Sequence, residues 1–200
     1  MSRPGYDDVL LVTGFPSLYA RKMVRHVLAE EPRSLVYVIV SGEDAERAED
    51  ERDALEREQR ERLVLVEGHP SAMDLGLSGA EFRRLTREVD RIHHMAFGAA
   101  GSMGRASAHK VNVVGAGEIL EFARAASSLD RLVFHSTAHV SGDRTGVVYE
   151  DDLAGGQSFR SDVEETRMQA EALARQAMRA APIAVVRPTT LVGDFDPIED

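Results

Sequence analysis

The sequence contains no cysteine and no tryptophan among its 200 residues. The absence of cysteine excludes disulfide bonds, thiolate metal sites and cysteine nucleophiles. No apolar stretch approaches the roughly 20 residues that a membrane span requires. The N-terminal segment MSRPGYDD also lacks the apolar core of a signal peptide. We therefore expect a cytoplasmic protein that has no membrane partner.

Positive charge is also scarce in this chain. It has 24 Lys and Arg residues against 34 Asp and Glu residues, which gives a formal net charge of -10 at pH 7. Such a charge repels nucleic acid and anionic lipid surfaces, so we expect neither as a partner. An anionic cofactor remains compatible with it, because the dipole of a single helix can attract a phosphate locally.

Six short apolar runs, mostly of β-branched residues, alternate with helical patterns along the chain. The runs are Val9–Val12, Leu35–Val40, Leu63–Val66, Ile92–Phe97, Leu132–Phe134 and Ile183–Val186. This alternation predicts one α/β domain over residues 1–200, with a doubly wound parallel sheet of about six strands and helices on both faces. In such a Rossmann-type sheet, a ligand binds at the carboxyl ends of the strands.

The first run leads into the turn Thr13-Gly14 and then into a helical pattern, which is typical of a dinucleotide-binding fold. Glycine is needed there because the helix N-terminus must approach a pyrophosphate closely. A spacing of the type T-G-x-x-G-x-x-G would have its later glycines at positions 17 and 20, which are Ser17 and Ala20. Alanine is tolerated at the third position, whereas a side chain at the second meets the phosphate. We expect an intact architecture with a damaged phosphate cradle.

Residues 43–62 carry ten acidic and five basic side chains, and their pattern predicts one long helix. In four pairs the acid precedes the base by four positions, which is the favourable order. The pairs are Glu43 with Arg47, Asp53 with Arg57, Glu56 with Arg60 and Glu58 with Arg62. The segment is interpreted as a solvated surface helix or, alternatively, as a docking surface for a basic partner.

Two later helices begin with the capping-box spacing. Ser78 and Glu81 have this spacing, and so do Ser161 and Glu164. The fourth apolar run contains His93 and His94. Because adjacent residues of a strand point to opposite faces, these histidines do not jointly chelate a metal, and we predict no metal site.

Six segments in the same order resemble the extended short-chain dehydrogenase/reductases, most closely the branch of fatty acyl-CoA reductases and thioester reductase domains (male sterility, NAD-binding). These segments are Leu75–Ser78, Val89–Ala96, Asn112–Gly115, Ser136–Gly142, Ala170–Leu173 and Arg187–Asp194. The resemblance implies a nicotinamide cofactor, NADP or NAD, and the reduction of an acyl thioester to an aldehyde or alcohol. It also implies a substrate-binding region after the last strand, which we expect to be missing or truncated in these 200 residues.

In that family a tyrosine donates a proton to the developing alkoxide. A lysine four residues later lowers the tyrosine pKa and holds the ribose, and a Ser or Thr hydroxyl binds the carbonyl. The resemblance places the hydroxyls at Ser136 and Thr137. It places the tyrosine and lysine at Val163 and Arg167, so the proton donor is absent and the cation is changed.

The resemblance also indicates which residues would contact the cofactor. They are Thr13, Gly14, Ser17, Leu18, Ser41, His69, Ala96, Arg167 and Pro188. NADP-dependent relatives often have an arginine where this chain has Ser41, followed by Glu43 and Asp44, which would repel a 2′-phosphate. His69 stands where the family has an aspartate that contacts adenine. Cofactor binding is therefore expected to be weak or lost.

Two functions follow from these substitutions. The first is a non-catalytic scaffold or sensor that retains the dinucleotide-binding fold, with a homo-oligomer or a protein partner as its context. The second is an active oxidoreductase that reduces an acyl thioester, aldehyde or ketone with Ser136, Thr137 or a histidine in the proton transfer. The family fold also hosts epimerases and lyases, because fold alone does not decide function.

Overall fold

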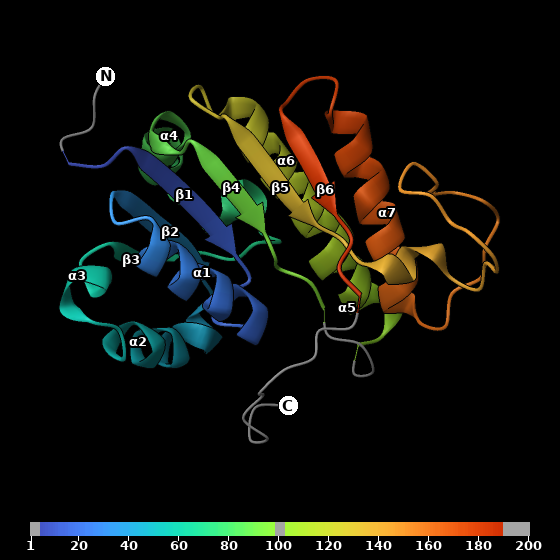
Figure 1. Cartoon of the computed structure of the whole chain (residues 1–200), viewed down its shortest axis with the longest axis horizontal. Coiled ribbons are helices and arrows are strands. Elements are labelled where there is room, and N and C mark those ends of the chain that lie inside the picture. Colours follow the sequence, from blue (N-terminus) through green and yellow to red (C-terminus); the bar gives the residue numbers. More distant parts are fainter. Residues whose placement is uncertain (1–4, 99–102, 190–200) are drawn as a thin grey trace.

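The computed structural model describes residues 5–98 and 103–189 of the chain. Six parallel strands form one sheet in the order β3-β2-β1-β4-β5-β6 (Figure 1). The strands are β1 (Asp8–Thr13), β2 (Ser34–Val40), β3 (Leu63–Glu67), β4 (Arg91–His94), β5 (Arg131–His135) and β6 (Ile183–Val186). β1 pairs with both β2 and β4, so the strand order reverses beside β1. A ligand site is expected outside the strand ends at that reversal.

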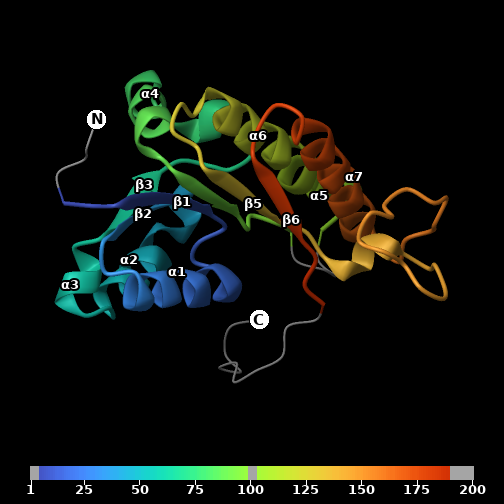
Figure 2. The ribbon, with the colours of Figure 1, turned by 45° about the horizontal axis from the view of Figure 1, so that its top comes forward.

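Helices cover both faces of the sheet (Figure 2). One face carries α1 (Leu18–Glu30), α2 (Ala45–Asp53) and α3 (Arg57–Arg60). The other carries α4 (Gly79–Glu88), α5 (Arg105–His109), α6 (Gly115–Ala125) and α7 (Asp162–Ala177). Four short helical segments are also present in the described residues: η1 (Gly42–Asp44), η2 (Met73–Gly76), η3 (Lys110–Val114) and η4 (Ala138–Ser141). The predicted doubly wound fold is confirmed.

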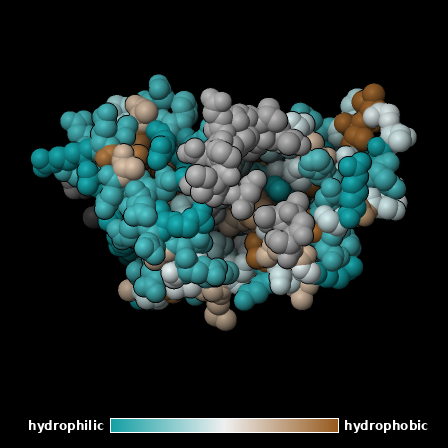
Figure 3. All heavy atoms as spheres, turned by 90° about the horizontal axis from the view of Figure 1, so that it is seen from below, coloured by the Kyte–Doolittle hydropathy of each residue, from teal (hydrophilic) through white to brown (hydrophobic). Residues whose placement is uncertain are grey.

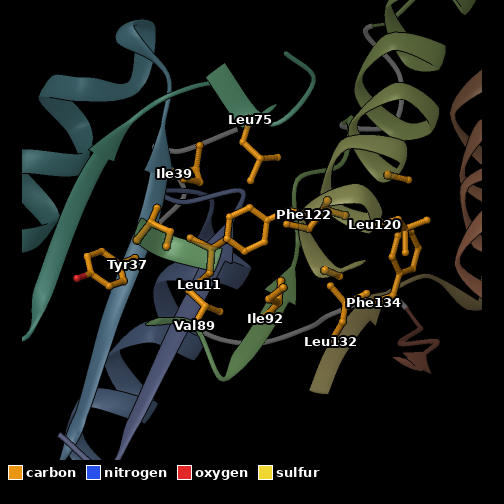
Figure 4. Packing of buried hydrophobic residues seen from close by; sticks show 14 of the residues in the cluster. Leu11, Tyr37, Ile39, Leu75, Val89, Ile92, Leu120, Phe122, Leu132 and Phe134 are labelled. Carbon is orange, nitrogen blue, oxygen red and sulfur yellow. The ribbon is translucent and has the colours of Figure 1, made fainter. Parts of the chain in front are cut away.

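Two apolar clusters hold these layers together, one on each face of the sheet. Figure 4 shows the larger cluster, in which Leu11 of β1 and Ile92 of β4 face Phe122 of α6. All three side chains are fully buried. Because side chains alternate along a strand, the neighbours Leu10 and Val12 of β1 belong to the second cluster, beneath α1. Burial on both faces makes β1 the centre of the domain.

The acidic segment 43–62 differs from its prediction, because it forms η1, α2 and α3 rather than one helix. The chain turns after Asp53, and this turn buries Leu55 in the same cluster as Ala48. Arg62 Nε donates to the Glu58 carbonyl rather than to its carboxylate, and the rest of the guanidinium donates to the carbonyls of Leu28, Glu31 and Ser34. Burial of one leucine and capping of α1 by Arg62 therefore outweigh the series of i,i+4 ion pairs.

The predicted caps are confirmed in one helix and in part in the other. Ser78 and Glu81 form a complete capping box at α4. At α7 the Ser161 hydroxyl accepts from the Glu164 N–H, but the Glu164 carboxylate accepts from the Arg160 N–H. The fourth strand was also predicted too long, because pairing ends at His94 and residues 95–98 leave the sheet.

Hydrophilic residues predominate on the face seen from below in Figure 3, apart from the atoms drawn in grey. Exposed large apolar side chains of the described residues include Met73 of η2 and Val147 and Tyr149 of the loop before α7. Within residues 5–98 and 103–189, no helix is long and apolar enough to cross a membrane.

A buried carboxylate joins α7, β6 and the end of β5. Glu171 of α7 is fully buried and accepts from the Ser136 hydroxyl at 2.5 Å, from Arg175 Nε at 2.8 Å and from Arg187 Nη2 at 2.7 Å. The two arginines also bind the backbone carbonyls of residues 149–152. One carboxylate thus binds two guanidinium groups that hold the loop before α7.

We predict that Gly14→Ala destabilises the domain. Gly14 has a φ of +88°, and an added Cβ would lie 2.4 Å from the Met95 carbonyl oxygen. Backbone strain of about 1–3 kcal/mol adds to this clash, so the free energy of unfolding in urea should fall by about 3 kcal/mol or more. Gly117→Ala is the matched control, because its Cβ meets nothing within 4 Å in α6, and alanine should stabilise that helix by about 0.5–1 kcal/mol. Equal effects of the two substitutions would contradict this account.

We predict that Glu171→Gln lowers the free energy of unfolding by about 3 kcal/mol at pH 7, because two arginines lose their buried counterion. Burial opposes ionisation of Glu171, but hydrogen bonds from Arg187, Ser136 and Arg175 outweigh it and lower its pKa. A lowered folded-state pKa stabilises the protein above the pKa of the unfolded carboxyl. This stabilisation is lost as pH falls through the folded-state pKa, so the difference between the variant and the wild type should shrink in acid.

The control for this variant is Glu121→Gln, which removes an exposed partner of Arg124. It should change the free energy of unfolding by no more than about 0.5 kcal/mol. A pH-independent difference between wild type and Glu171→Gln would show that packing, rather than ionisation, accounts for the effect.

Candidate functional site

A cavity of about 550 Å³ lies at the carboxyl ends of β1, β2 and β4. These strand ends form the lower edge of the sheet in Figure 1. Five of the residues predicted to contact a cofactor line this cavity: Gly14, Ser17, Ser41, His69 and Ala96. The remaining lining comes from the same turns and from residues that the sequence did not single out, among them Arg47 and Phe97.

The turn after β1 forms one wall of the cavity. Gly14 places its backbone directly against the backbone of Met95 and Ala96, where a Cβ would not fit. Thr13 is buried beneath this turn, and its hydroxyl accepts from the Met95 N–H and contacts His94 Nδ1 at 2.8 Å. The turn that leads into α1 thus packs backbone to backbone against residues 95 and 96. The cavity lies beside this contact.

Ser17 and Leu18 form the start of α1. Ser17 is exposed and caps the helix, since its hydroxyl accepts from the Ala20 N–H at 3.4 Å. Leu18 is the first helical residue. The hydroxyl therefore occupies one of the N–H groups that a helix N-terminus otherwise offers to an anion. The start of α1 therefore offers one fewer N–H group to a phosphate, although the close backbone contact at Gly14 is present.

The far end of the cavity is lined by charged residues. Ser41 Oγ donates to Asp44 Oδ2 at 2.9 Å, and Arg47 Nη1 lies 3.6 Å from Asp44 Oδ1. Glu43 also lines the cavity, and His69 Nδ1 accepts from the Ser71 N–H at 3.1 Å. Sequence reasoning assigned Arg47 to an ion pair with Glu43 and so missed that it faces the cavity. The sequence indicates this position of Arg47 only in that Arg47 follows Glu43 and Asp44 by one helical turn.

Ser136 and Thr137 follow β5, and their hydroxyls have different partners. Ser136 donates to the buried Glu171, so this hydroxyl is held inside the domain. Thr137 Oγ1 accepts from the His139 N–H at 3.3 Å, which leaves its own hydrogen able to bind a carbonyl. The predicted roles of both residues stay predictions, and the contacts favour Thr137 over Ser136 for binding a ligand.

Val163 and Arg167 lie on the first two turns of α7. Val163 is buried and carries no proton donor. Arg167 reaches the end of β5, where Nη2 donates to the Ser136 carbonyl at 3.0 Å and to the His135 carbonyl at 3.3 Å. Its guanidinium lies 4.3 Å from the ring centre of Phe97. Burial lowers the Arg167 pKa to about 10, so the group remains charged at neutral pH.

Arg167 connects the cavity with the end of β5 through Phe97, which lines the cavity. Pro188 lies beyond β6, and its carbonyl accepts from the Ala138 N–H at 3.0 Å. Thr13, Leu18, Thr137, Arg167 and Pro188 are not among the residues that line this cavity. The last residues of the Arg187–Asp194 segment, 190–194, lie outside the described residues.

The histidines of β4 point to opposite faces of the sheet, as predicted. His94 is fully buried against Thr13 and Phe134, whereas His93 Nδ1 lies 3.1 Å from His135 Nε2. Burial, with smaller effects from His135 and Arg167, lowers the His94 pKa to about 3. In the part of the chain that the structure describes, no group of three His, Asp or Glu side chains is arranged to hold a metal ion.

Two features of the cavity suit a dinucleotide. Gly14 contributes no side chain to the turn that precedes α1, where a phosphate group would lie. Ser41 and Asp44 offer a hydroxyl and a carboxylate at the end of β2, where a ribose would lie. The residues present are therefore able to hold such a group.

Comparison with known proteins agrees with this geometry. A family model of NAD-binding domains, described as male sterility protein, matches residues 12–199. Fatty acyl-CoA reductase 1 of Arabidopsis thaliana is 25% identical, over 79% of this chain and 36% of that protein. The probable fatty acyl-CoA reductase 4 of the same plant is also 25% identical, over 82% of this chain and 38% of that protein. The chain spans little more than a third of the length of these relatives.

Solved structures show the same fold. The terminal R domain from the myxalamid PKS-NRPS biosynthetic pathway has a TM-score of 0.83 and 26% identity to this chain. The match covers 96% of this chain and 50% of the R-domain chain. A UDP-glucuronic acid 4-epimerase from Bacillus cereus in complex with NAD has a TM-score of 0.72 at 20% identity and shares the fold. Because the family model covers nearly all of its residues, this chain belongs to the male sterility protein family of NAD-binding domains.

Proposed function

We propose that this chain binds a nicotinamide dinucleotide in the cavity beside β1. The observation that supports this most directly is the contact of Gly14 with the Met95 backbone, which leaves no space for a side chain at the phosphate turn. Gly14 and the N-terminus of α1 would hold the pyrophosphate. Ser41, Asp44 and His69 would contact the first nucleoside.

We propose that NAD(H) is preferred over NADP(H). Glu43 and Asp44 place two carboxylates at the end of the cavity that a 2′-phosphate would enter. Arg47 is the cation that faces them, and Asp44 already partly neutralises it at 3.6 Å. A carboxylate at the end of the second strand also suits the free ribose hydroxyls of NAD.

The family's proton transfer is lost at position 163. A bound reduced dinucleotide supplies a hydride, but the alkoxide formed from a carbonyl also needs an acid. Val163 is buried in the position that the resemblance assigns to the tyrosine, and Arg167 is directed to backbone carbonyls. These contacts support a scaffold or sensor that binds the dinucleotide without the usual chemistry.

A second candidate function is an oxidoreductase that uses a different proton donor. The hydroxyl of Thr137 favours it, because this group is held at the end of β5 by the His139 N–H and has its hydrogen available. The relatives named as fatty acyl-CoA reductases indicate an acyl thioester or the corresponding aldehyde as the substrate class. The two candidates differ in one physical respect, which is whether a group other than residue 163 delivers a proton.

Binding is tested by thermal denaturation with NAD, NADH, NADP and NADPH in separate titrations. A ligand that binds only the folded state should raise the Tm by about 5–10 °C at a concentration about 100-fold above its Kd. The rise should be larger for NAD(H) than for NADP(H). A Tm unaffected by all four dinucleotides at millimolar concentration would refute the proposed function.

Asp44→Asn tests the stated preference in the same assay. The variant removes a charge next to Arg47, so the affinity for NADP(H) should rise about tenfold, which corresponds to about 1.4 kcal/mol. Glu49→Gln removes a charge from the exposed side of α2, where Glu49 pairs with Arg52, and serves as the matched control. Equal gains in the two variants would attribute the effect to net charge alone.

The loss of the family's acid is tested by Val163→Tyr combined with Arg167→Lys. This pair restores a phenol and an ammonium group one helical turn apart. If no other residue delivers the proton, oxidation of NADH by octanal or octanoyl-CoA should then exceed the wild-type rate by about 100-fold, the lower range of general acid catalysis. If the variant binds NADH but shows no gain in rate, position 163 is not the feature that limits the chemistry.

A further inference from the structure

Three polar side chains form a hydrogen-bonded chain on the α1 face of the sheet. Tyr19 Oη lies 3.0 Å from His135 Nδ1, and His135 Nε2 lies 3.1 Å from His93 Nδ1. The Tyr19 ring packs edge-on against the His135 ring, with a centroid separation of 5.3 Å. The three residues come from α1, β5 and β4, so only the tertiary fold brings them together.

His135 links these three hydrogen-bonded side chains to the candidate site in two ways. It is the last residue of β5, directly before Ser136 and Thr137. Its ring contacts the Tyr19 hydroxyl, while its backbone carbonyl accepts from Arg167 at 3.3 Å. A phenol from α1 and the cation of α7 are therefore held at the end of the same strand, two residues before Thr137 in the sequence.

We propose that the Tyr19 phenol is the proton donor of an oxidoreductase reaction in this chain, with His135 and His93 as the relay that reprotonates it. The proposal rests on the dinucleotide binding proposed above and favours the second candidate function. It assigns to residue 19 the task that the resemblance assigns to residue 163. The phenol, the cation and the strand-end hydroxyl are then all present, but the phenol comes from a different helix.

The direction of the hydrogen bonds decides whether Tyr19, His135 and His93 can deliver a proton. With a proton on His135 Nδ1, that group donates to Tyr19 Oη and leaves the phenolic O–H able to donate to a substrate. His135 Nε2 then accepts from His93 Nδ1. The opposite arrangement has Tyr19 donate to His135, which would keep the phenolic proton inside the protein.

The step balances with one hydride and one proton. A reduced dinucleotide, when bound, would supply the hydride to the carbonyl carbon, and the electron pair of the carbonyl bond would move to oxygen. That oxygen takes the proton of Tyr19. Tyr19 takes the Nδ1 proton of His135, whose Nε2 takes the Nδ1 proton of His93, and water supplies a proton to His93 Nε2. The chain resets when both imidazoles return to their first tautomer.

The charged groups around the chain keep its members in the required states. Burial raises the Tyr19 pKa and the charge of Arg167 lowers it, with a net rise, so the phenol stays protonated at neutral pH. Burial lowers the pKa of His135 to about 4, with smaller effects from His93 and Arg167. The pKa of His93 is also about 4, because burial and Arg91 outweigh Glu31 and Asp8. Both imidazoles are therefore neutral at pH 7, as the relay requires.

The first test compares Tyr19→Phe with wild type in the oxidation of NADH by octanal. Removal of one oxygen keeps the ring packing and should lower the rate by at least about 100-fold, with little change in NADH affinity. Tyr149→Phe is the matched control, because it removes a phenol that is 68% exposed, and it should leave the rate unchanged. Val163→Tyr with Arg167→Lys should restore turnover to the Tyr19→Phe variant.

The second test needs no turnover. In protein labelled with nitrogen-15 histidine, nuclear magnetic resonance should show the proton of neutral His135 on Nδ1. Tyr19→Phe should shift the signals of His135 and His93, whereas Tyr149→Phe should not. Ultraviolet titration should show that Tyr19→Phe removes one phenol that ionises above the ordinary pKa of about 10.

The outcomes separate this inference from the proposed function. If NADH binds but wild type does not oxidise it with octanal or octanoyl-CoA, or if Tyr19→Phe is as active as wild type, the inference is wrong and binding stands. A proton on His135 Nε2 also overturns the inference, because Tyr19 would then donate inward. If no dinucleotide binds, the proposed function itself fails.

Discussion

The contact between the turn after β1 and the segment after β4 is the constraint on which the rest of the site depends. Gly14 and Met95 meet backbone to backbone, with no room for a Cβ. Below them, the Thr13 hydroxyl joins the Met95 N–H to His94. This contact fixes where β1 and β4 diverge, and divergence at the reversal of strand order creates the crevice at the strand ends.

The end of β5 shows how the fold keeps a charge in a partly buried place. Arg167 is stabilised there by two backbone carbonyls and by the face of Phe97, although its buried Nε has no hydrogen-bond partner among the described residues. Burial accordingly lowers its pKa. A planar guanidinium suits this setting, because it stacks on a ring and donates to carbonyls at the same time, which an ammonium group cannot do.

Two adjacent hydroxyls at this strand end illustrate the difference between a residue type and its role. Ser136 is directed into the network of Glu171, Arg175 and Arg187, so it contributes to the position of α7 and of the loop before it. Thr137 is directed to a short turn and keeps its proton available. Alternation of side chains along the extended backbone gives two adjacent hydroxyls different partners.

The sequence by itself determined the six strands, the fold class and the turn at Gly14, because buried parallel strands and a glycine turn leave local patterns of apolar and small residues. It also determined that position 163 carries no acid. It did not reveal the break in the acidic segment, since burial of Leu55 depends on a partner surface that is distant in sequence. For the same reason only the tertiary structure decided that Arg47 faces the cavity and that Tyr19, His135 and His93 form one chain. Side chains from separate elements meet only after the sheet has formed, and no local periodicity encodes such a meeting.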